Sequence, residues 1–229
     1  MTPVVVADAA ALAEAGAAWT AGRITSAVAE RGACYLALAG GGTPRGCYQR
    51  LAQPPYRGDL PWERVFVYWS DERQVPLDDP ESNYGMARAA LLDQVPIPTA
   101  QIFPLVGNPL PDLRRIPTDG AGRPRFDLVH LGLGEDGHTA SLFPGDPALE
   151  ETAAWVRAVR AIKPPPERLT LTFPVLNAAR AVLFQVQGAG KRQPLAGMLA
   201  RDERYPASRV DPVDGDLSVI VDRAAYPAD

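Results

Sequence analysis

The sequence predicts an α/β fold in which an open, mainly parallel sheet carries helices on both faces. Short apolar runs alternate with stretches of helical character along all 229 residues, and this alternation is typical of strand–helix–strand units. Most of the apolar runs are nearly continuous, which is the pattern of strands covered on both sides. The length suits one domain with a substantial core, and we expect that domain to span residues 1–229.

Seven short apolar runs are predicted as strands. In chain order they are Pro3–Val6, Tyr35–Ala39, Val65–Trp69, Phe126–Leu131, Leu169–Phe173, Ala181–Val186 and Leu217–Val221. Five stretches between them are predicted as helices. In chain order these are Ala9–Glu30, Gly46–Ala52, Asn83–Gln94, Val175–Ala179 and Lys191–Ala200. The segment Asp211–Tyr226 is expected to close the fold with the last strand and a short helix.

Glycine and proline separate these elements. The 20 Gly and 24 Pro residues concentrate in Gln53–Pro61, Val106–Pro124 and Lys163–Pro166, where they favour turns and loops. Only Val106–Pro124 resembles a linker. Because it is short and its charges are mixed, we interpret it as a surface loop within the domain.

The composition excludes several classes of protein. A formal net charge of −4 at pH 7 argues against a nucleic-acid partner. No apolar run approaches the roughly 18 residues that cross a bilayer, so no membrane partner is expected. The N-terminus lacks the basic and apolar regions of a signal peptide, and we expect a cytoplasmic location. The two Cys and two His are scattered, so neither a disulfide scaffold nor a metal site is expected.

Four polar clusters each follow a predicted strand directly. They are Gly40–Pro44, Ser70–Arg73, Gly134–Thr139 and Gly188–Lys191. In an open parallel sheet, ligands bind beyond the carboxyl ends of the strands. We therefore expect these clusters to contribute to one binding site.

The first cluster is a glycine-rich turn that opens a helix. The backbone N–H groups of Gly41, Gly42 and Thr43 suit an anion such as phosphate, because glycines permit close approach and a helix N-terminus favours negative charge. A plain strand–helix turn is the alternative. No Lys-Ser/Thr pair follows, so the turn is not a Walker A loop.

The third cluster contains a G-x-G-x-x-G pattern at Gly132, Gly134 and Gly137. We reject a dinucleotide-binding fingerprint, because Pro144 interrupts the following segment and no second strand ends in an acid at the required distance.

His138 in this cluster is the candidate general base. An imidazole titrates near neutral pH, and Asp136, two residues away, is placed to orient the ring. His130 lies inside a predicted strand and is interpreted as buried structure. A serine nucleophile at Ser141 is disfavoured because no G-x-S-x-G elbow is present.

Arg73 and Lys191 are the candidate cations for an anionic ligand. A surface ion pair is a strong alternative for Arg73. Lys191 stands out because the chain has only two Lys, and the other, Lys163, lies in a proline-rich loop. The residues directly beside Cys34 and Cys47 are uncharged, and both Cys are expected in the core.

At these residues the sequence resembles the 6-phosphogluconolactonase family. LGLGEDGHTASLFPG (Leu131–Gly145) is close to that family's signature, and AGGGTP (Ala39–Pro44) is similar to its glycine turn, with Gly42 where a small polar residue is usual. SDERQVPLDDPESNYGMARAALL (Ser70–Leu92) and KPPPERLTLTFPVLNAARAVLFQVQGAGK (Lys163–Lys191) resemble its other two blocks. One interval departs from the family: Gly107–Arg125 is too short and proline-rich for the acidic, Tyr-containing helix that usually stands there.

The resemblance implies a fold shared with glucosamine-6-phosphate deaminase and ribose-5-phosphate isomerase, and no cofactor. It implies hydrolysis of a small phosphorylated sugar lactone in the oxidative pentose phosphate pathway. His138 would be the base, with Asp136 orienting it. Arg73, Lys191 and the Gly41–Thr43 turn would bind the phosphate. We expect a monomer or a weak homo-oligomer.

Two other functions stay open at this point. An amino-sugar-phosphate deaminase or isomerase on the same fold would carry an extra carboxylate soon after the histidine, whereas the first acid after His138 is Asp146. A non-enzymatic sugar-phosphate sensor would bind without turnover.

Overall fold

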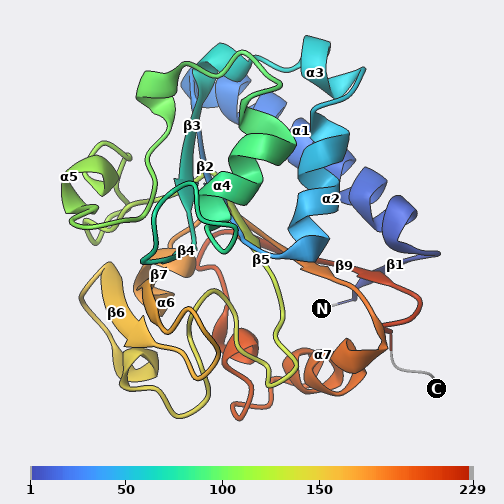
Figure 1. Cartoon of the computed structure of the whole chain (residues 1–229), viewed down its shortest axis with the longest axis vertical. Coiled ribbons are helices and arrows are strands. Elements are labelled where there is room, and N and C mark those ends of the chain that lie inside the picture. Colours follow the sequence, from blue (N-terminus) through green and yellow to red (C-terminus); the bar gives the residue numbers. More distant parts are fainter. Residues whose placement is uncertain (1, 227–229) are drawn as a thin grey trace.

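A six-stranded parallel sheet forms the centre of the computed structural model, which describes residues 2–226 (Figure 1). Its strand order is β1-β9-β8-β5-β2-β3, and every neighbouring pair is parallel. The bounds are β1 Val4–Val6, β2 Cys34–Leu38, β3 Val65–Trp69, β5 Leu128–Leu131, β8 Ala181–Val186 and β9 Asp216–Asp222. The predicted open parallel sheet is therefore confirmed, and six of the seven predicted strands belong to it.

Helices cover both faces of this sheet (Figure 1). Leu183 of β8 and Ile220 of β9 pack with Leu12 of helix α1 on one face. Neighbouring strand residues alternate in direction, so Phe184 and Val221 point to the opposite face and join the core that includes α7. The helices are α1 Ala9–Arg31, α2 Gly42–Leu51, α3 Tyr56–Asp59, α4 Asn83–Ala87, α5 Leu110–Leu113, α6 Phe173–Leu176 and α7 Arg192–Leu199.

Local sequence determines the ends of α1. The carboxylate of Asp8 accepts a hydrogen bond from Ala11 N (2.9 Å) as an N-cap, and Gly32 ends the helix in the left-handed region with φ 77°, a conformation that glycine adopts without strain.

A second, antiparallel sheet was not predicted. It has the order β4-β7-β6, with β4 at Asp71–Arg73, β6 at Val156–Arg160 and β7 at Glu167–Leu171. The segment Leu169–Phe173, predicted as one more strand of the main sheet, is divided between β7 and helix α6. Pro174 stands in the first turn of α6, where a proline favours a helical start and cannot continue a strand ladder.

Three other predicted segments differ in detail. Helix α2 begins at Gly42 rather than Gly46. The predicted helix Asn83–Gln94 is α4 followed by a π-helical turn at Arg88–Leu92. After β9 the chain forms a turn rather than the predicted short helix, as far as the described residues extend.

The interval Gly107–Arg125 holds only the single helical turn α5 and an isolated bridge between Thr118 and Pro124. The expectation that this stretch has no room for a long helix is met. Within residues 2–226, no helix combines the length and apolar character needed to cross a membrane.

Candidate active site

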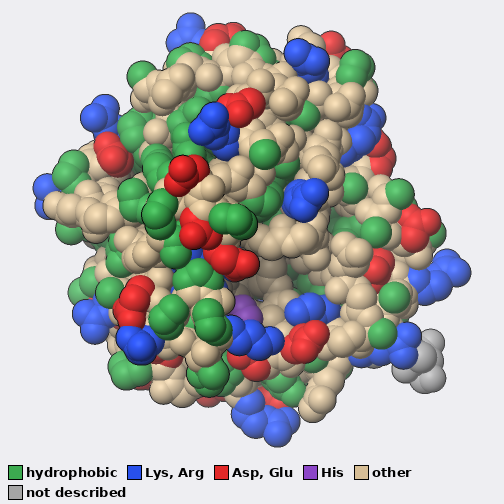
Figure 2. Space-filling model, in the orientation of Figure 1, with side chains coloured by type: hydrophobic (Ala, Val, Ile, Leu, Met, Phe, Trp, Pro, Cys, Tyr) green, Lys and Arg blue, Asp and Glu red, His purple; other side chains and the backbone are tan. Residues whose placement is uncertain are grey.

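The four polar clusters meet in one pocket of about 240 Å³. It lies beyond the carboxyl ends of β2, β5 and β8, where the two sheets adjoin, and Figure 2 shows the molecule hollowed there, with a histidine and basic side chains around the opening. The sequence-predicted residues that line it are Gly41, Gly42, Thr43, Arg73, His138 and Lys191. The convergence predicted from strand ends is thus present in the structure.

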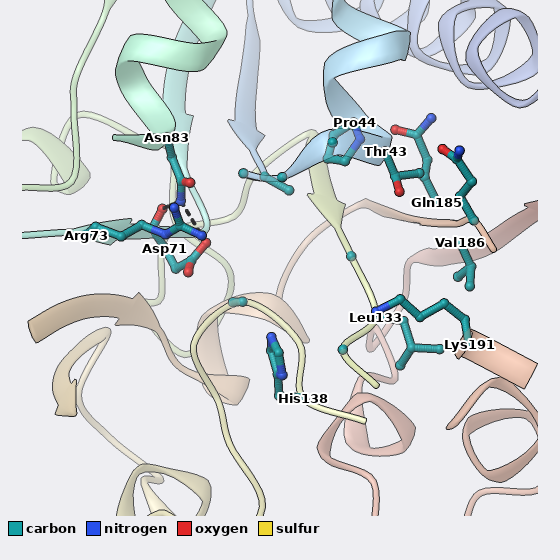
Figure 3. A pocket seen from close by; sticks show the side chains of 18 of the residues that line it. Thr43, Pro44, Asp71, Arg73, Asn83, Leu133, His138, Gln185, Val186 and Lys191 are labelled. Carbon is teal, nitrogen blue, oxygen red and sulfur yellow. Dashed lines mark hydrogen bonds between the residues drawn. The ribbon is translucent and has the colours of Figure 1, made fainter. Parts of the chain in front are cut away.

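His138 follows β5 on a tight turn. Gly137 takes φ 80° in this turn, and Gly134 N donates to the His138 carbonyl oxygen (2.8 Å). A Cβ on Gly134 would lie 2.1 Å from His138 Nδ1, so only glycine leaves room for the ring. The ring packs against Phe143 with the two centroids 4.7 Å apart and points into the pocket (Figure 3).

Asp136 holds the ring from behind. Its Oδ1 lies 2.5 Å from His138 Nδ1, and Asp136 does not itself line the pocket. Burial acts to raise the pKa of this carboxyl, but the charge and hydrogen bonds of His138 outweigh that effect and hold the pKa below its ordinary value. A carboxylate that accepts a hydrogen bond from Nδ1–H keeps the proton of the neutral ring on Nδ1 and leaves Nε2 unprotonated toward the pocket, which is the arrangement of a general base.

The glycine turn presents backbone donors. Gly41 has φ 99° and precedes the first turn of α2, and no side chain caps that helix among the described residues. A Cβ on Gly40 would lie 1.8 Å from Asn83 Oδ1, so close packing against α4 requires glycine there. The uncapped N–H groups of Gly42 and Thr43 are suited to an anion in the pocket.

Lys191 and Arg73 enter the pocket from opposite sides, and His138 points into the space between them (Figure 3). Lys191 follows β8 on a turn that begins at Gly188 (φ 94°), whose N–H donates to Asp222 (3.0 Å). Lys191 forms no ion pair within residues 2–226. Arg73 donates to the Glu81 carbonyl oxygen (2.6 Å), and its Nε is buried without a partner in the described part of the chain.

The pocket is also lined by polar side chains that sequence reasoning did not single out, and Asp71, Asn83 and Arg168 are among them. Asp71 accepts hydrogen bonds from Ser141 Oγ (2.6 Å) and Asn83 Nδ2 (3.3 Å). Ser141 is fully buried in this contact, so it is not exposed as a nucleophile. Asp71 stands in a cluster that the sequence does mark. Arg168 carries no such signal, because it lies within a strand of the unpredicted sheet.

Glu72 beside the pocket has a structural role. It accepts backbone N–H bonds from Arg73 (2.7 Å), Asn83 (2.8 Å) and Tyr84 (2.7 Å). Burial raises its pKa, although these hydrogen bonds oppose the rise. Glu72 thereby ties the start of α4 to β4 and fixes the positions of Arg73 and Asn83.

The other His and both Cys lie away from the chemistry. His130 is buried beneath α1, and burial lowers its pKa to about 4. Burial also raises the pKa of Cys47 to about 12 and that of Cys34 well above its ordinary value, so both are inert thiols. Among residues 2–226, no cluster of three or more His, Cys, Asp or Glu side chains is arranged to hold a metal ion.

Comparisons with known proteins show which proteins this chain is similar to. A family profile described as glucosamine-6-phosphate isomerases/6-phosphogluconolactonase matches residues 7–219. The chain is 43% identical over 217 residues to the 6-phosphogluconolactonase of Synechocystis, covering 89% of this chain and 88% of that protein. Its structure is similar to that of 6-phosphogluconolactonase from Trypanosoma brucei, with a TM-score of 0.84 and 30% identity over 98% of this chain and 97% of the other. A monomeric glucosamine-6-phosphate deaminase, 22% identical, shares the fold with a TM-score of 0.79 over 98% of each chain.

Proposed function

This chain belongs to the glucosamine-6-phosphate isomerase/6-phosphogluconolactonase family, and on that premise we propose that its pocket hydrolyses 6-phospho-D-glucono-1,5-lactone to 6-phosphogluconate. The observation that carries the proposal is the histidine of the pocket. His138 has its Nδ1 held 2.5 Å from a carboxylate and its other edge free toward a pocket with cations on two sides. This arrangement suits general-base activation of a water molecule beside an anionic substrate.

The phosphate group belongs at the Lys191 side of the pocket. The uncapped start of α2 at Gly41–Thr43 supplies N–H donors, and Lys191 supplies an ammonium that forms no ion pair within the described part of the chain. Binding energy from this remote group holds the lactone ring beside His138. Sequence reasoning placed Arg73 on the phosphate as well. Because Arg73 enters from the opposite side (Figure 3), we assign it to the other end of the substrate, where the lactone carbonyl lies.

His138 moves the protons of the reaction. Its Nε2 takes a proton from water as the water oxygen attacks C1 of the lactone, and the carbonyl electrons move onto the carbonyl oxygen. The tetrahedral intermediate then collapses: the bond from C1 to the ring oxygen breaks, and that oxygen receives the proton from the imidazolium. The new carboxylic acid releases its proton to solvent. Asp136 stabilises the imidazolium in between.

The pocket is less suited to an amino-sugar-phosphate deaminase. The first acid after His138 is Asp146, whose carboxylate accepts a hydrogen bond from Ala148 N (2.7 Å) and does not line the pocket. The additional carboxylate expected of a deaminase is therefore not supplied by this segment.

A paired assay tests the proposal. Freshly generated 6-phosphogluconolactone is hydrolysed at controlled pH with the spontaneous rate subtracted, and glucosamine 6-phosphate is assayed for ammonia release. We expect enzyme-dependent lactone hydrolysis and no ammonia. Ammonia release without lactone hydrolysis would identify a deaminase. Ligand-dependent thermal stabilisation with neither reaction would identify a sensor.

A further inference from the structure

Arg168 is a buried cation of the pocket that makes no direct ion pair among the described residues. It lies on β7, only 8% of its surface is accessible to solvent, and it lines the pocket together with Arg73. Its Nε donates to the Pro165 carbonyl oxygen (3.2 Å) and its Nη2 to the Lys163 carbonyl oxygen (3.4 Å). Within residues 2–226 it forms no ion pair, and its Nη1 has no hydrogen-bond partner.

Two neighbouring arginines, Arg73 and Arg168, line this end of the pocket. Burial and the nearby charge of Arg73 lower the pKa of Arg168, although the charges of Asp71, Glu81 and Glu72 oppose this effect. Arg73 itself is paired only loosely, with its Nη1 3.7 Å from the Glu81 carboxylate. The pocket carboxylate of Asp71 is engaged by Ser141 and Asn83. A buried guanidinium that makes no direct ion pair is costly, and an anionic group of a ligand bound to it would lower that cost.

We propose that Arg168 and Arg73 together form an oxyanion subsite, which binds the negative charge that develops on the lactone carbonyl oxygen and the carboxylate of the product. This inference rests on the proposed function and names the donors that act at the reacting end of the substrate. Arg168 is thus a catalytic residue, in contact with the reacting oxygen.

The two ends of the pocket match the two anionic groups of 6-phosphogluconate. We assign the phosphate to the Lys191 end and the carboxylate to the arginine end. Figure 3 shows Lys191 and Arg73 on opposite sides of the pocket, with His138 pointing into the space between them. Guanidinium groups suit a carboxylate because their planar donors match its two oxygens. The uncharged lactone carbonyl gains most from these donors when it becomes an oxyanion, so the interaction favours the transition state over the bound substrate.

A structural role is the competing explanation, because Arg168 also holds the loop at Lys163–Pro165 through its carbonyl oxygens. Two ligands separate the explanations. 6-Phosphogluconate has both the phosphate and the carboxylate, whereas glucitol 6-phosphate has the phosphate and a hydroxymethyl group instead. Their dissociation constants are measured by calorimetry for the wild type, Arg168→Gln, Arg168→Lys and Arg73→Gln. Arg160→Gln is the matched control, because Arg160 lies on the same hairpin but is exposed and paired with Glu167.

Arg168→Gln is expected to weaken 6-phosphogluconate binding by about 10- to 100-fold, the value of a charge-assisted hydrogen bond to a carboxylate. Glucitol 6-phosphate binding should change by less than about twofold. The kcat for the lactone should fall by about 100-fold, as on loss of one oxyanion donor. Arg168→Lys keeps the positive charge but not the planar guanidinium, and it should recover part of both losses. Arg73→Gln should show the same ligand selectivity.

The opposite pattern is expected of the phosphate end. Lys191→Ala should weaken both ligands alike, and Arg160→Gln should weaken neither. Equal losses for both ligands in Arg168→Gln, or no loss for either, would overturn the subsite. Circular dichroism shows whether Arg168→Gln folds. If it does not, the test rests on whether Arg168→Lys and Arg73→Gln weaken the binding of 6-phosphogluconate more than the binding of glucitol 6-phosphate. A wild-type protein that binds both ligands but hydrolyses no lactone would instead contradict the proposed function.

Discussion

His130 provides a pH dependence of stability that follows from its contacts. The Thr20 hydroxyl donates to the Gly16 carbonyl oxygen (2.7 Å) and lies 3.0 Å from His130 Nε2. The hydroxyl hydrogen is therefore used, and the neutral ring carries its proton on Nε2 and donates to Thr20. Nδ1 is buried without a partner among residues 2–226. A second proton would sit on Nδ1 with no acceptor, and burial accordingly lowers the pKa of His130 to about 4 from 6.5.

The unfolded chain binds this proton near pH 6.5, but the native protein binds it only near pH 4. Acid therefore favours unfolding between these values, and the stabilisation is present above pH 6.5 and lost as the pH falls toward 4. At about 1.4 kcal/mol per pH unit, the contribution of His130 to the free energy of unfolding changes by about 3 kcal/mol over the whole interval. About 2 kcal/mol of this change falls between pH 7 and pH 5.

His130→Phe isolates this effect. The variant removes the titration, keeps a flat ring stacked on Tyr48, and leaves the Thr20 hydroxyl bonded to Gly16. Urea unfolding of both proteins is followed from pH 8 to pH 4. The difference between their unfolding free energies is taken at each pH, so that the contributions of the other titrating groups cancel. We expect the wild type to lose about 2 kcal/mol relative to the variant between pH 7 and pH 5. A difference that does not change with pH would refute this account of His130.

Two further predictions concern the catalytic turn and its surroundings. Gly134→Ala places a Cβ 2.1 Å from His138 Nδ1 and 2.6 Å from Asp136 Oδ1, so kcat should fall by at least about 10-fold. The control is Gly22→Ala, because its added Cβ meets no atom within 4 Å. An unaltered kcat in Gly134→Ala would show that the contact between Asp136 and His138 does not position the base. Ser141→Ala should lower the free energy of unfolding by about 1–3 kcal/mol, because Asp71 loses a buried hydrogen bond, yet turnover should persist above the background rate. Loss of all turnover in a folded Ser141→Ala protein would instead support Ser141 as a nucleophile.

The parallel sheet was predictable because its strands are short apolar runs that need burial on both faces. β3 at Val65–Trp69 and β8 at Ala181–Val186 have the predicted bounds. The second sheet was not predictable in this way. β4 reads Asp-Glu-Arg and β6 reads Val-Arg-Ala-Val-Arg, so neither has an apolar run, and both are strands because each pairs with β7.

The same distinction separates the predicted from the unpredicted parts of the site. His138 and Lys191 were found because each follows a strand of the parallel sheet, and strand ends of such a sheet converge. The contact between His138 and Asp136 agrees with the expected orientation of the ring, and their catalytic roles remain predictions. Arg168 was missed because its place in the pocket depends on the antiparallel pairing of β7 with β4. The position of Arg73 across the pocket from Lys191 likewise depends on that pairing, which no local pattern in the sequence reports.

The most direct test of the account is the steady-state hydrolysis of 6-phosphogluconolactone by the wild type and by His138→Ala. Loss of a general base is expected to lower kcat by about 100-fold or more. KM should change little, because the groups proposed to bind the substrate stay in place. Circular dichroism verifies that the variant is folded, and the spontaneous rate is subtracted throughout. An unchanged kcat in folded His138→Ala would contradict the assignment of His138 as the base that activates water.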